Sequence, residues 1–377
     1  MPKAYWDDGQ GKDYREIETQ FEDCPSCGSQ LVYSAKSKMI QCEHCGYSEE
    51  TRSERDHIVE LELKKAIEKL QHFEPGHMER YGFQCGNCGA RFLIERDDVR
   101  IKCGFCASDQ VNKTAIKENF IQPLGIIPFY ISRPEAEASY KEWIQKGWFH
   151  PNSLKRESKL HSLHGIYIPF WTFDAQTIAH WSGQAGHYYY VTRRVYVNGK
   201  MQTKQVRKIR WVSRSGTLRH FFDDITVSGS DKIERSLVDR ILPYRLDEAV
   251  NFDARLLLGW ESEIYDVEID AAYEMADQIM DFKLRHMCSG QLGGDTQRGL
   301  HVRSQKSEQT FKLLVLPLWI SSYKYRGKLY HFMINGQTGR VNGKKPLSWW
   351  KITLLILLFL LFAAGLVILR ESGLIQI

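Results

Sequence analysis

The chain has 377 residues, which is enough for two or three domains and one sizeable core. Its contents of 43% hydrophobic and 26% charged residues are those of a folded protein and exclude wholesale disorder. The net charge of +5 is spread unevenly. Residues 1–120 hold 17 basic against 22 acidic residues (net −5), and residues 121–377 hold 34 against 24 (net +10). We therefore expect the two halves to face different surroundings.

Residues 1–20 form an N-terminal tail with neither an apolar core nor a signal-peptide cleavage pattern. We therefore expect the thiols to lie in a reducing compartment, where paired Cys-x-x-Cys arrays usually bind metal and seldom form disulfides. Eight of the nine cysteines fall into two such arrays. The ninth, Cys288, follows a predicted helix and is expected to be a buried thiol.

Residues 21–50 and 79–118 each contain the pattern Cys-x2-Cys, fourteen residues, Cys-x2-Cys, and the second array begins 61 positions after the first. Two facing Cys-x2-Cys turns supply four thiolates in a tetrahedron, with zinc–sulfur distances of about 2.3 Å, and the residues between them suit a hairpin. The pattern predicts two zinc ribbons with two structural Zn²⁺ ions per chain. The predicted ligands are Cys24, Cys27, Cys42 and Cys45 in the first ribbon and Cys85, Cys88, Cys103 and Cys106 in the second.

Zinc is favoured over a rubredoxin-like iron centre because structural four-thiolate sites mostly hold zinc. Four thiolates leave no open position for water, so a catalytic metal is not expected. Gly28, Gly46 and Gly89 follow second cysteines, where a turn often requires a positive φ angle. With two bound ions the first 120 residues carry a charge of about −9. This charge favours protein contact over nucleic acid for the ribbons.

Residues 51–78 show apolar residues at helical spacing and end at Pro75-Gly76. We interpret them as a helical spacer between the ribbons, in preference to a helix with an apolar docking stripe.

Residues 119–346 form the largest block, a β-rich, antiparallel α+β domain. Asn198-Gly199 between two β-prone runs predicts a hairpin. Helices are predicted at 134–146, 231–241 and 268–287. In the last of these, one face is expected to contain Ala271, Met275, Ile279, Phe282 and Leu284.

No acidic residue lies between Asp174 and Asp223, whereas basic residues are frequent there. A solvated hairpin is the first interpretation of this stretch, a contact with anionic membrane lipid the second, and nucleic acid the third. The candidate basic surface consists of Arg193, Arg194, Lys200, Lys204, Arg207, Lys208 and Arg210.

Residues 349–370 are predicted to form a transmembrane helix, followed by a short tail at 371–377. Residues 352–369 contain a single polar side chain, Thr353, and span about 27 Å as a helix. Trp349 and Trp350 occupy the place of an aromatic belt. Lysines before the span predict a single-pass protein of the cell membrane with its N-terminal bulk in the cytoplasm.

The sequence offers no convincing catalytic set. The stretch from Gly339 to Lys344 is one residue too short for a phosphate loop, and neither G-x-S-x-G nor H-E-x-x-H occurs. We therefore expect a protein that is not an enzyme.

Several segments occur in a specific order: CPSCG and CGNCGA, then GWFHPNSLK (147–155), GIYIPFWTFDAQT (165–177), FFDD (221–224), LPLW (316–319) and YRGKLYHFMINGQTGRVNGKKP (325–346). In this order the chain resembles a bacterial family of membrane-anchored proteins with TFIIB-type zinc ribbons, often named after a primosomal helicase. The chain has no helicase motor motif. The resemblance covers nearly the whole chain and all eight ribbon cysteines, and it implies partners among membrane-organising proteins of the flotillin (SPFH) or phage-shock type.

The expected fold is α+β and multidomain: two tandem β zinc ribbons, a β-rich antiparallel α+β domain and one C-terminal transmembrane helix. The expected function is a membrane-anchored, zinc-binding scaffold or adaptor that presents its ribbons to protein partners, in membrane organisation or envelope stress. The alternative is a membrane-associated nucleic-acid-binding protein of replication or transcription. The sequence names neither the partners nor the oligomeric state.

Overall fold

The computed structural model describes residues 23–371, with gaps at 30, 35–36, 51–57, 72–79, 88–90, 94–107, 109–110, 117–120, 155–158, 161–162, 198–199, 234 and 327. The described strands form two sheets, one of three strands and one of 13. Pairing in the large sheet is mostly antiparallel, and helices are few. The expectation of an antiparallel α+β fold is therefore confirmed.

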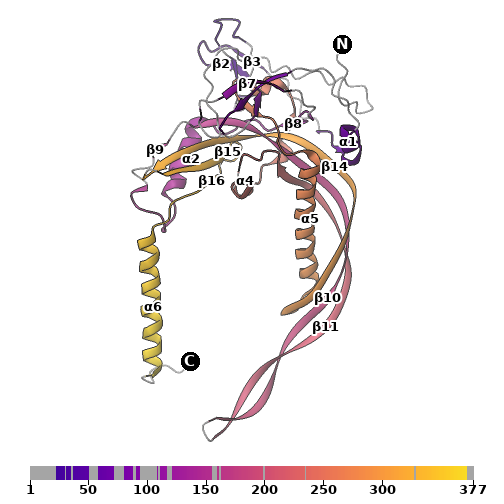
Figure 1. The fold of residues 1–377 in the computed structure, drawn as a ribbon, viewed down its shortest axis with the longest axis vertical. Helices are drawn as coiled ribbons and strands as arrows, with labels where there is room; N and C mark the ends of the chain where they lie inside the picture. Colours follow the sequence, from indigo (N-terminus) through magenta and orange to yellow (C-terminus); the bar gives the residue numbers. More distant parts are fainter. Residues whose placement is uncertain are drawn as a thin grey trace.

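Three long strands dominate the large sheet: β10 (His164–Val197), β11 (Lys200–Ser228) and β14 (Thr296–Tyr325). The central strand, β10, pairs with β11 from Phe170↔Ser228 to Val197↔Lys200 and with β14 from His164↔Ile320 to Gly186↔Thr296. The hairpin predicted around residues 198–199 is confirmed by this register. Its strands are far longer than the two β-prone runs, because β14 provides a third strand along most of β10 (Figure 1).

Short strands complete the sheet at the end where β10 and β14 bury their apolar runs. They are β4 (Leu61–Glu62), β8 (Gly125–Ile126), β9 (Lys159–Leu160), β12 (Val250–Asn251), β13 (Glu261–Glu263), β15 (Lys328–Asn335) and β16 (Val341–Gly343). Two 3₁₀ turns, η1 (Leu246–Glu248) and η2 (Ala254–Leu257), lie between β11 and β13. The apolar runs around Pro169 and Pro317 face each other in this region, where Tyr167 pairs with Pro317 and Pro169 with Val315.

Helix α5 (Ile269–Leu292) packs along β10, β11 and β14 (Figure 1). Its small residues Ala272 and Ala276 let it lie close to the sheet, and Cys288 is fully buried, as expected. The buried face is rotated from the predicted one, because Ala271 and Phe282 are exposed while Leu284 is buried. The residues that α5 buries are Ile269, Ala272, Ala276, Met280, Leu284, Cys288 and Leu292.

The other helices are α1 (Leu63–Gln71), α2 (Arg133–Gln145), α4 (Arg235–Ile241) and α6 (Trp349–Glu371). Helix α2 begins with a capping box in which Ser132 and Glu135 bond reciprocally. Within residues 51–78, helix α1 and the strand before it pack on the main domain. Leu63 and Ala66 are buried against the main sheet, and the preceding strand β4 pairs with β14 at Phe311.

The first cysteine array forms the three-stranded sheet of β1 (Leu31–Ser34), β2 (Met39–Cys42) and β3 (Ser48–Glu50). In the second array β5 (Arg80–Cys85), β6 (Arg91–Leu93) and β7 (Val111–Ile116) belong to the large sheet. Strand β6 pairs with β13 at Leu93↔Ser262, so these strands continue the main sheet instead of forming a sheet of their own.

Candidate metal centre and basic arm

The first array folds into two matching turns. Gly28 N donates to Cys24 O at 2.8 Å, and Gly46 N donates to Cys42 O at 3.0 Å. Both glycines have positive φ angles, 70° and 79°, which side chains rarely adopt. The requirement for glycine at these two positions, predicted from the sequence, is therefore confirmed.

The four thiols of the first array converge. The sulfur atoms of Cys24, Cys27, Cys42 and Cys45 lie within 4.8 Å of one another, with Cys24 Sγ 3.4 Å from Cys45 Sγ and Cys27 Sγ 3.6 Å from Cys42 Sγ. A zinc ion with four sulfurs at about 2.3 Å separates those sulfurs by about 3.8 Å. These two sulfur pairs are slightly closer than in a loaded site, and the four sulfurs together could hold one metal ion.

The thiols differ in their readiness to ionise. Hydrogen bonds from the Ser29 side chain and backbone lower the pKa of Cys27 to about 5. A backbone hydrogen bond from Tyr47 lowers the pKa of Cys45, but the bond with Cys24, burial and the other two thiols raise it to about 12. Four thiolates repel one another at this distance, and a divalent cation offsets that repulsion by replacing the thiol protons.

The first ribbon is docked on the main domain. Tyr33 N donates to Leu258 O at 3.3 Å, and Val32 packs so closely on Gly259 that a Cβ atom there would lie 2.9 Å from it. Leu31, Tyr33 and Ile40 share one apolar cluster with residues of the main domain. The fold of this array therefore does not depend on its four thiols alone, because the main domain extends its small core.

The second array is described in part. Cys85 is buried at the end of β5, which pairs with both β6 and β7. Cys88, Cys103 and Cys106 lie outside the described residues, as does Gly89. The second metal site therefore stays a prediction.

A second group of potential ligands comprises Asp174, Asp223 and Asp224, whose carboxylates lie within 4.8 Å of one another. Lys312 supplies a cation beside this group, with its Nζ 2.9 Å from Asp224 Oδ1 and 3.0 Å from Glu60 Oε1. Burial and a hydrogen bond with Glu60 raise the pKa of Asp174 to about 7. An ammonium group thus occupies the place where a cation would bind.

The predicted basic residues lie on what we call the arm, residues 187–210, where only β10 and β11 pair because β14 begins opposite Gly186. The arm projects away from the rest of the molecule (Figure 1). Arg193, Arg194, Lys204, Arg207, Lys208 and Arg210 are all exposed there. The Lys200 side chain lies outside the described residues.

The arm has two different faces, because paired residues share a face and successive residues alternate. One face pairs Arg193 with Lys204 and Tyr189 with Lys208. The other pairs Tyr196 with Met201, and there Arg207 lies 4.3 Å above the Tyr188 ring. One face is thus mainly basic and the other mainly aromatic and apolar. The exposed large side chains of the second face are Tyr190, Tyr196, Met201 and Ile209.

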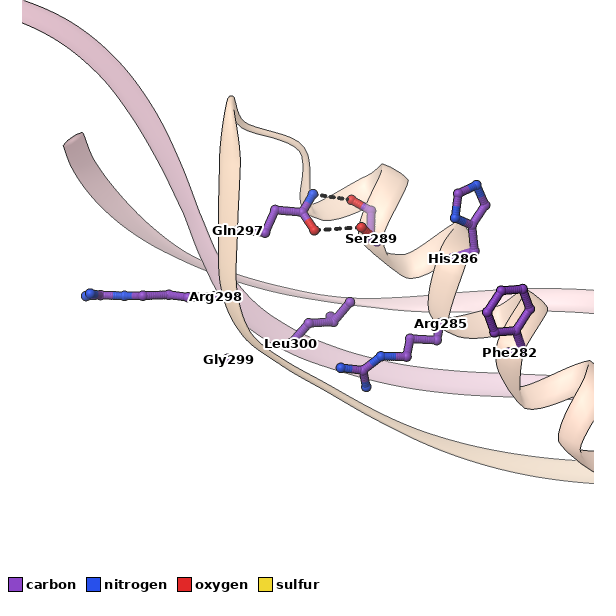
Figure 2. A pocket seen from close by; sticks show the side chains of 8 residues that line it. All are labelled: Phe282, Arg285, His286, Ser289, Gln297, Arg298, Gly299 and Leu300. Carbon is purple, nitrogen blue, oxygen red and sulfur yellow. Dashed lines mark hydrogen bonds between the residues drawn. The ribbon is translucent and has the colours of Figure 1, made fainter. Parts of the chain in front are cut away.

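A hollow lies between the C-terminal half of α5 and the start of β14 (Figure 2). Ser289 Oγ lies 2.6 Å from Gln297 Oε1, and Gln297 Nε2 donates to Ser289 O at 2.7 Å. The Arg298 guanidinium donates to Gln184 Oε1 and stacks on the Trp211 ring. Ser289 is therefore bonded to an amide, whereas an activated serine requires a base. The lining residues are Phe282, Arg285, His286, Ser289, Gln297, Arg298, Gly299 and Leu300.

Helix α6 is long and apolar enough to span a membrane, and only 6% of its segment Trp349–Leu366 is buried. The described structure is therefore that of an α+β protein with a four-thiol centre and an exposed apolar C-terminal helix.

The chain is 26% identical over 332 residues to an uncharacterized protein, YdjG, of Bacillus subtilis (strain 168). These residues are 87% of this chain and 91% of YdjG. No family model matches the chain, and no solved structure matches it. The similarity to YdjG extends along most of both chains. Because YdjG is uncharacterized, the similarity indicates no activity, ligand or partner for this chain.

Proposed function

We propose that the protein is a non-enzymatic, membrane-anchored scaffold or adaptor whose zinc ribbons present rigid surfaces to protein partners on the cytoplasmic side of the cell membrane. One observation carries the proposal: a closed four-thiol centre and an exposed apolar helix belong to one continuous body. Four thiolates complete the coordination of zinc, so the ion serves the fold. In this proposal the second array binds the second zinc ion.

The exposed edge of the first ribbon is acidic, since Glu43, Glu49 and Glu50 all face solvent. An acidic surface repels phosphate and favours contact with a protein. The resemblance stated from the sequence supports flotillin (SPFH) or phage-shock-type proteins as partners, and membrane organisation or envelope stress as the process.

Metal analysis of the full-length protein in detergent tests the centre. We expect two zinc ions per chain in the wild type and one after Cys42→Ser. Cys288→Ala is the matched control, because this thiol lies on the buried face of α5, outside both arrays, and it should retain both ions. A coloured protein identifies iron instead of zinc. An unchanged metal content after Cys42→Ser contradicts the centre.

Affinity capture from detergent-solubilised membranes tests the scaffold. We expect the intact chain in the membrane fraction and a chain lacking residues 349–377 in the soluble fraction. Partners captured by the wild type and by Cys288→Ala should be lost with Cys24→Ser/Cys42→Ser. A soluble intact chain, or partners that survive the double substitution, would overturn the proposal.

Nucleic acid is the second candidate ligand, and the arm is the observation that favours it. Basic side chains interleaved with tyrosines suit phosphates and stacked bases. If this candidate holds, the full-length protein in detergent retards labelled single-stranded DNA in a gel-shift assay. Binding should weaken steeply as the salt concentration rises, and it should weaken in the variant Arg207→Ala/Lys208→Ala/Arg210→Ala. A shift that is insensitive to these substitutions excludes the arm.

A further inference from the structure

Exposed aromatic and apolar side chains surround the start of α6, and they come from two distant parts of the sequence. Trp349 and Trp350 belong to the helix itself, and Leu347 precedes it. Trp148 and Phe149 follow α2 about 200 residues earlier, yet they are 54% and 43% exposed. Large apolar groups that gather in the open beside an apolar helix indicate a common apolar partner.

Backbone and side-chain bonds hold the two parts together. Ser348 N donates to Phe149 O at 2.8 Å. His150 Nδ1 lies 2.9 Å from Pro346 O. The loop of residues 147–152 is therefore attached directly to the segment that leads into α6.

The strongest attachment is made by Lys351, in the first turn of α6. Its ammonium donates to Trp148 O at 3.0 Å, His150 O at 2.9 Å and Asn152 Oδ1 at 2.8 Å, and the residue is only 6% exposed. Three acceptors match the three N–H donors of an ammonium group. A cation at this position would otherwise have to reach toward water or lipid headgroups. The loop thus removes the exposed charge from the start of the helix.

A second lysine attaches the same segment to α2. Lys345 Nζ donates to Trp143 O and Lys146 O at the end of that helix and lies 4.1 Å above the Trp143 ring. Cations at a helix C-terminus are favourable because they meet unpaired carbonyl groups. The segment that leads into α6 is therefore fixed to the body at both of its ends, by Lys345 and by Lys351.

We propose that Trp148 and Phe149, together with Leu347, Trp349 and Trp350, form an aromatic collar seated in the bilayer at headgroup level around α6. This inference rests on the proposed function, because it requires α6 to span the membrane. The collar is continuous with the apolar surface of α6, and tryptophan is the residue most suited to the boundary between hydrocarbon and headgroups. The loop of residues 147–152 is thereby a second membrane contact, from a part of the chain that is distant in sequence from α6.

Photo-crosslinking of the full-length chain in phosphatidylcholine vesicles tests the collar. The substitution Phe149→benzoylphenylalanine should give a lipid adduct. Phe359→benzoylphenylalanine, in the middle of α6, is the control for the span. Val59→benzoylphenylalanine is the control for the body, because Val59 is also exposed but precedes α1, which lies on the opposite side of the body from α6 (Figure 1).

Lipid adducts at positions 149 and 359, without one at position 59, support the collar. An adduct at 359 without one at 149 overturns the collar and leaves the span intact. No adduct at 359 overturns the span and the proposed function with it. A crosslink from position 149 to another chain, in place of lipid, shows contact between copies and overturns the collar.

Lys351→Met tests whether the hydrogen bonds of this lysine hold the loop of residues 147–152 in the bilayer, or whether the loop lies there without them. Loss of the three hydrogen bonds should lower the adduct at position 149 about fivefold while the adduct at 359 stays constant. An unchanged adduct at 149 would show that the loop is seated in the bilayer without Lys351, and would overturn the role assigned to this lysine.

Discussion

Lys312 is the cation of a partly buried carboxylate network beside the bulge of β10. Its ammonium lies 2.9 Å from Asp224 and 3.0 Å from Glu60, and these groups in turn contact Asp174 and Thr310. The side chain of Lys312 is 12% exposed, so water screens the network weakly. Removing the ammonium would leave several carboxylates facing one another.

We expect Lys312→Met to lower the free energy of unfolding by about 3 kcal/mol, because it leaves a partly buried carboxylate network without its cation. Urea denaturation of the detergent-purified protein measures the change. Lys65→Met is the matched control, since Lys65 bonds Glu62 on an exposed surface and should leave the midpoint unchanged. Equal effects of the two substitutions would contradict this account.

Glu261 gives a pH-dependent prediction. Burial raises the pKa of its carboxyl group to about 7, against about 4.3 in an unfolded chain. The folded state therefore holds the proton more tightly. This contribution to stability is fully present below pH of about 4.3 and is lost as pH rises through about 7.

Glu261→Gln should accordingly lessen the loss of stability between pH 5 and pH 8, a range set by these two pKa values of roughly 4.3 and 7. Thermal unfolding followed at both ends of that range measures it. Glu137→Gln, at an exposed carboxylate paired with Arg133, is the control and should leave the pH profile as it is. A Glu261→Gln profile that coincides with wild type contradicts the burial effect.

Residue identity predicted the four-thiol centre well, because Cys-x2-Cys turns and their glycines are local patterns. The aspartate group was missed, although a signal existed. In a hairpin turning at 198–199, Asp174 comes to lie opposite Asp223 by counting back from the turn, apart from one bulge. The three acceptors of Lys351 had no such signal, because they lie 199 to 203 residues away in the sequence.

At the scale of elements, the existence of helices was easier to predict than their faces. Helix α5 buries Ala272, Ala276 and Met280 instead of Ala271, Met275 and Ile279, because the sheet contacts a face one residue further along the helix, and the local apolar pattern does not distinguish the two faces. The sequence before α1 predicts a helix, but this segment forms strand β4, which pairs with β14. Strand pairing between distant segments, as for β6 with β13, has no local sequence signal.

The arm provides a prediction of its own. Beyond Gly186 the hairpin loses its third strand, and a two-stranded ribbon is only marginally stable in water. We expect amide hydrogen exchange, followed by mass spectrometry, to be much faster in residues 188–197 than in residues 168–181. Comparable protection in the two stretches would show that another chain or segment pairs with the arm.

At the scale of the whole molecule, α6 and the arm extend from the body in the same general direction (Figure 1). Only α6 suits hydrocarbon, because the arm carries several cations and two unpaired strand edges. We therefore expect a bilayer that accepts α6 to deflect the arm along its headgroups, which on the proposed cytoplasmic side are anionic.

This arrangement predicts that vesicles containing phosphatidylglycerol slow amide exchange in the arm of the reconstituted protein, whereas pure phosphatidylcholine vesicles do not. Arg207→Gln/Lys208→Gln/Arg210→Gln should abolish the difference, since basic groups supply the attraction. Equal slowing by both kinds of vesicle would assign the contact to the tyrosine face instead.

The three hydrogen bonds of Lys351 also couple the orientation of α6 to that of the body. A helix clamped at its first turn cannot swivel independently of the part it carries, so a change in bilayer thickness that alters its tilt rotates everything above it. The three-stranded sheet with the four thiols lies on the side of the body away from α6 (Figure 1), so such a rotation would displace it relative to the bilayer.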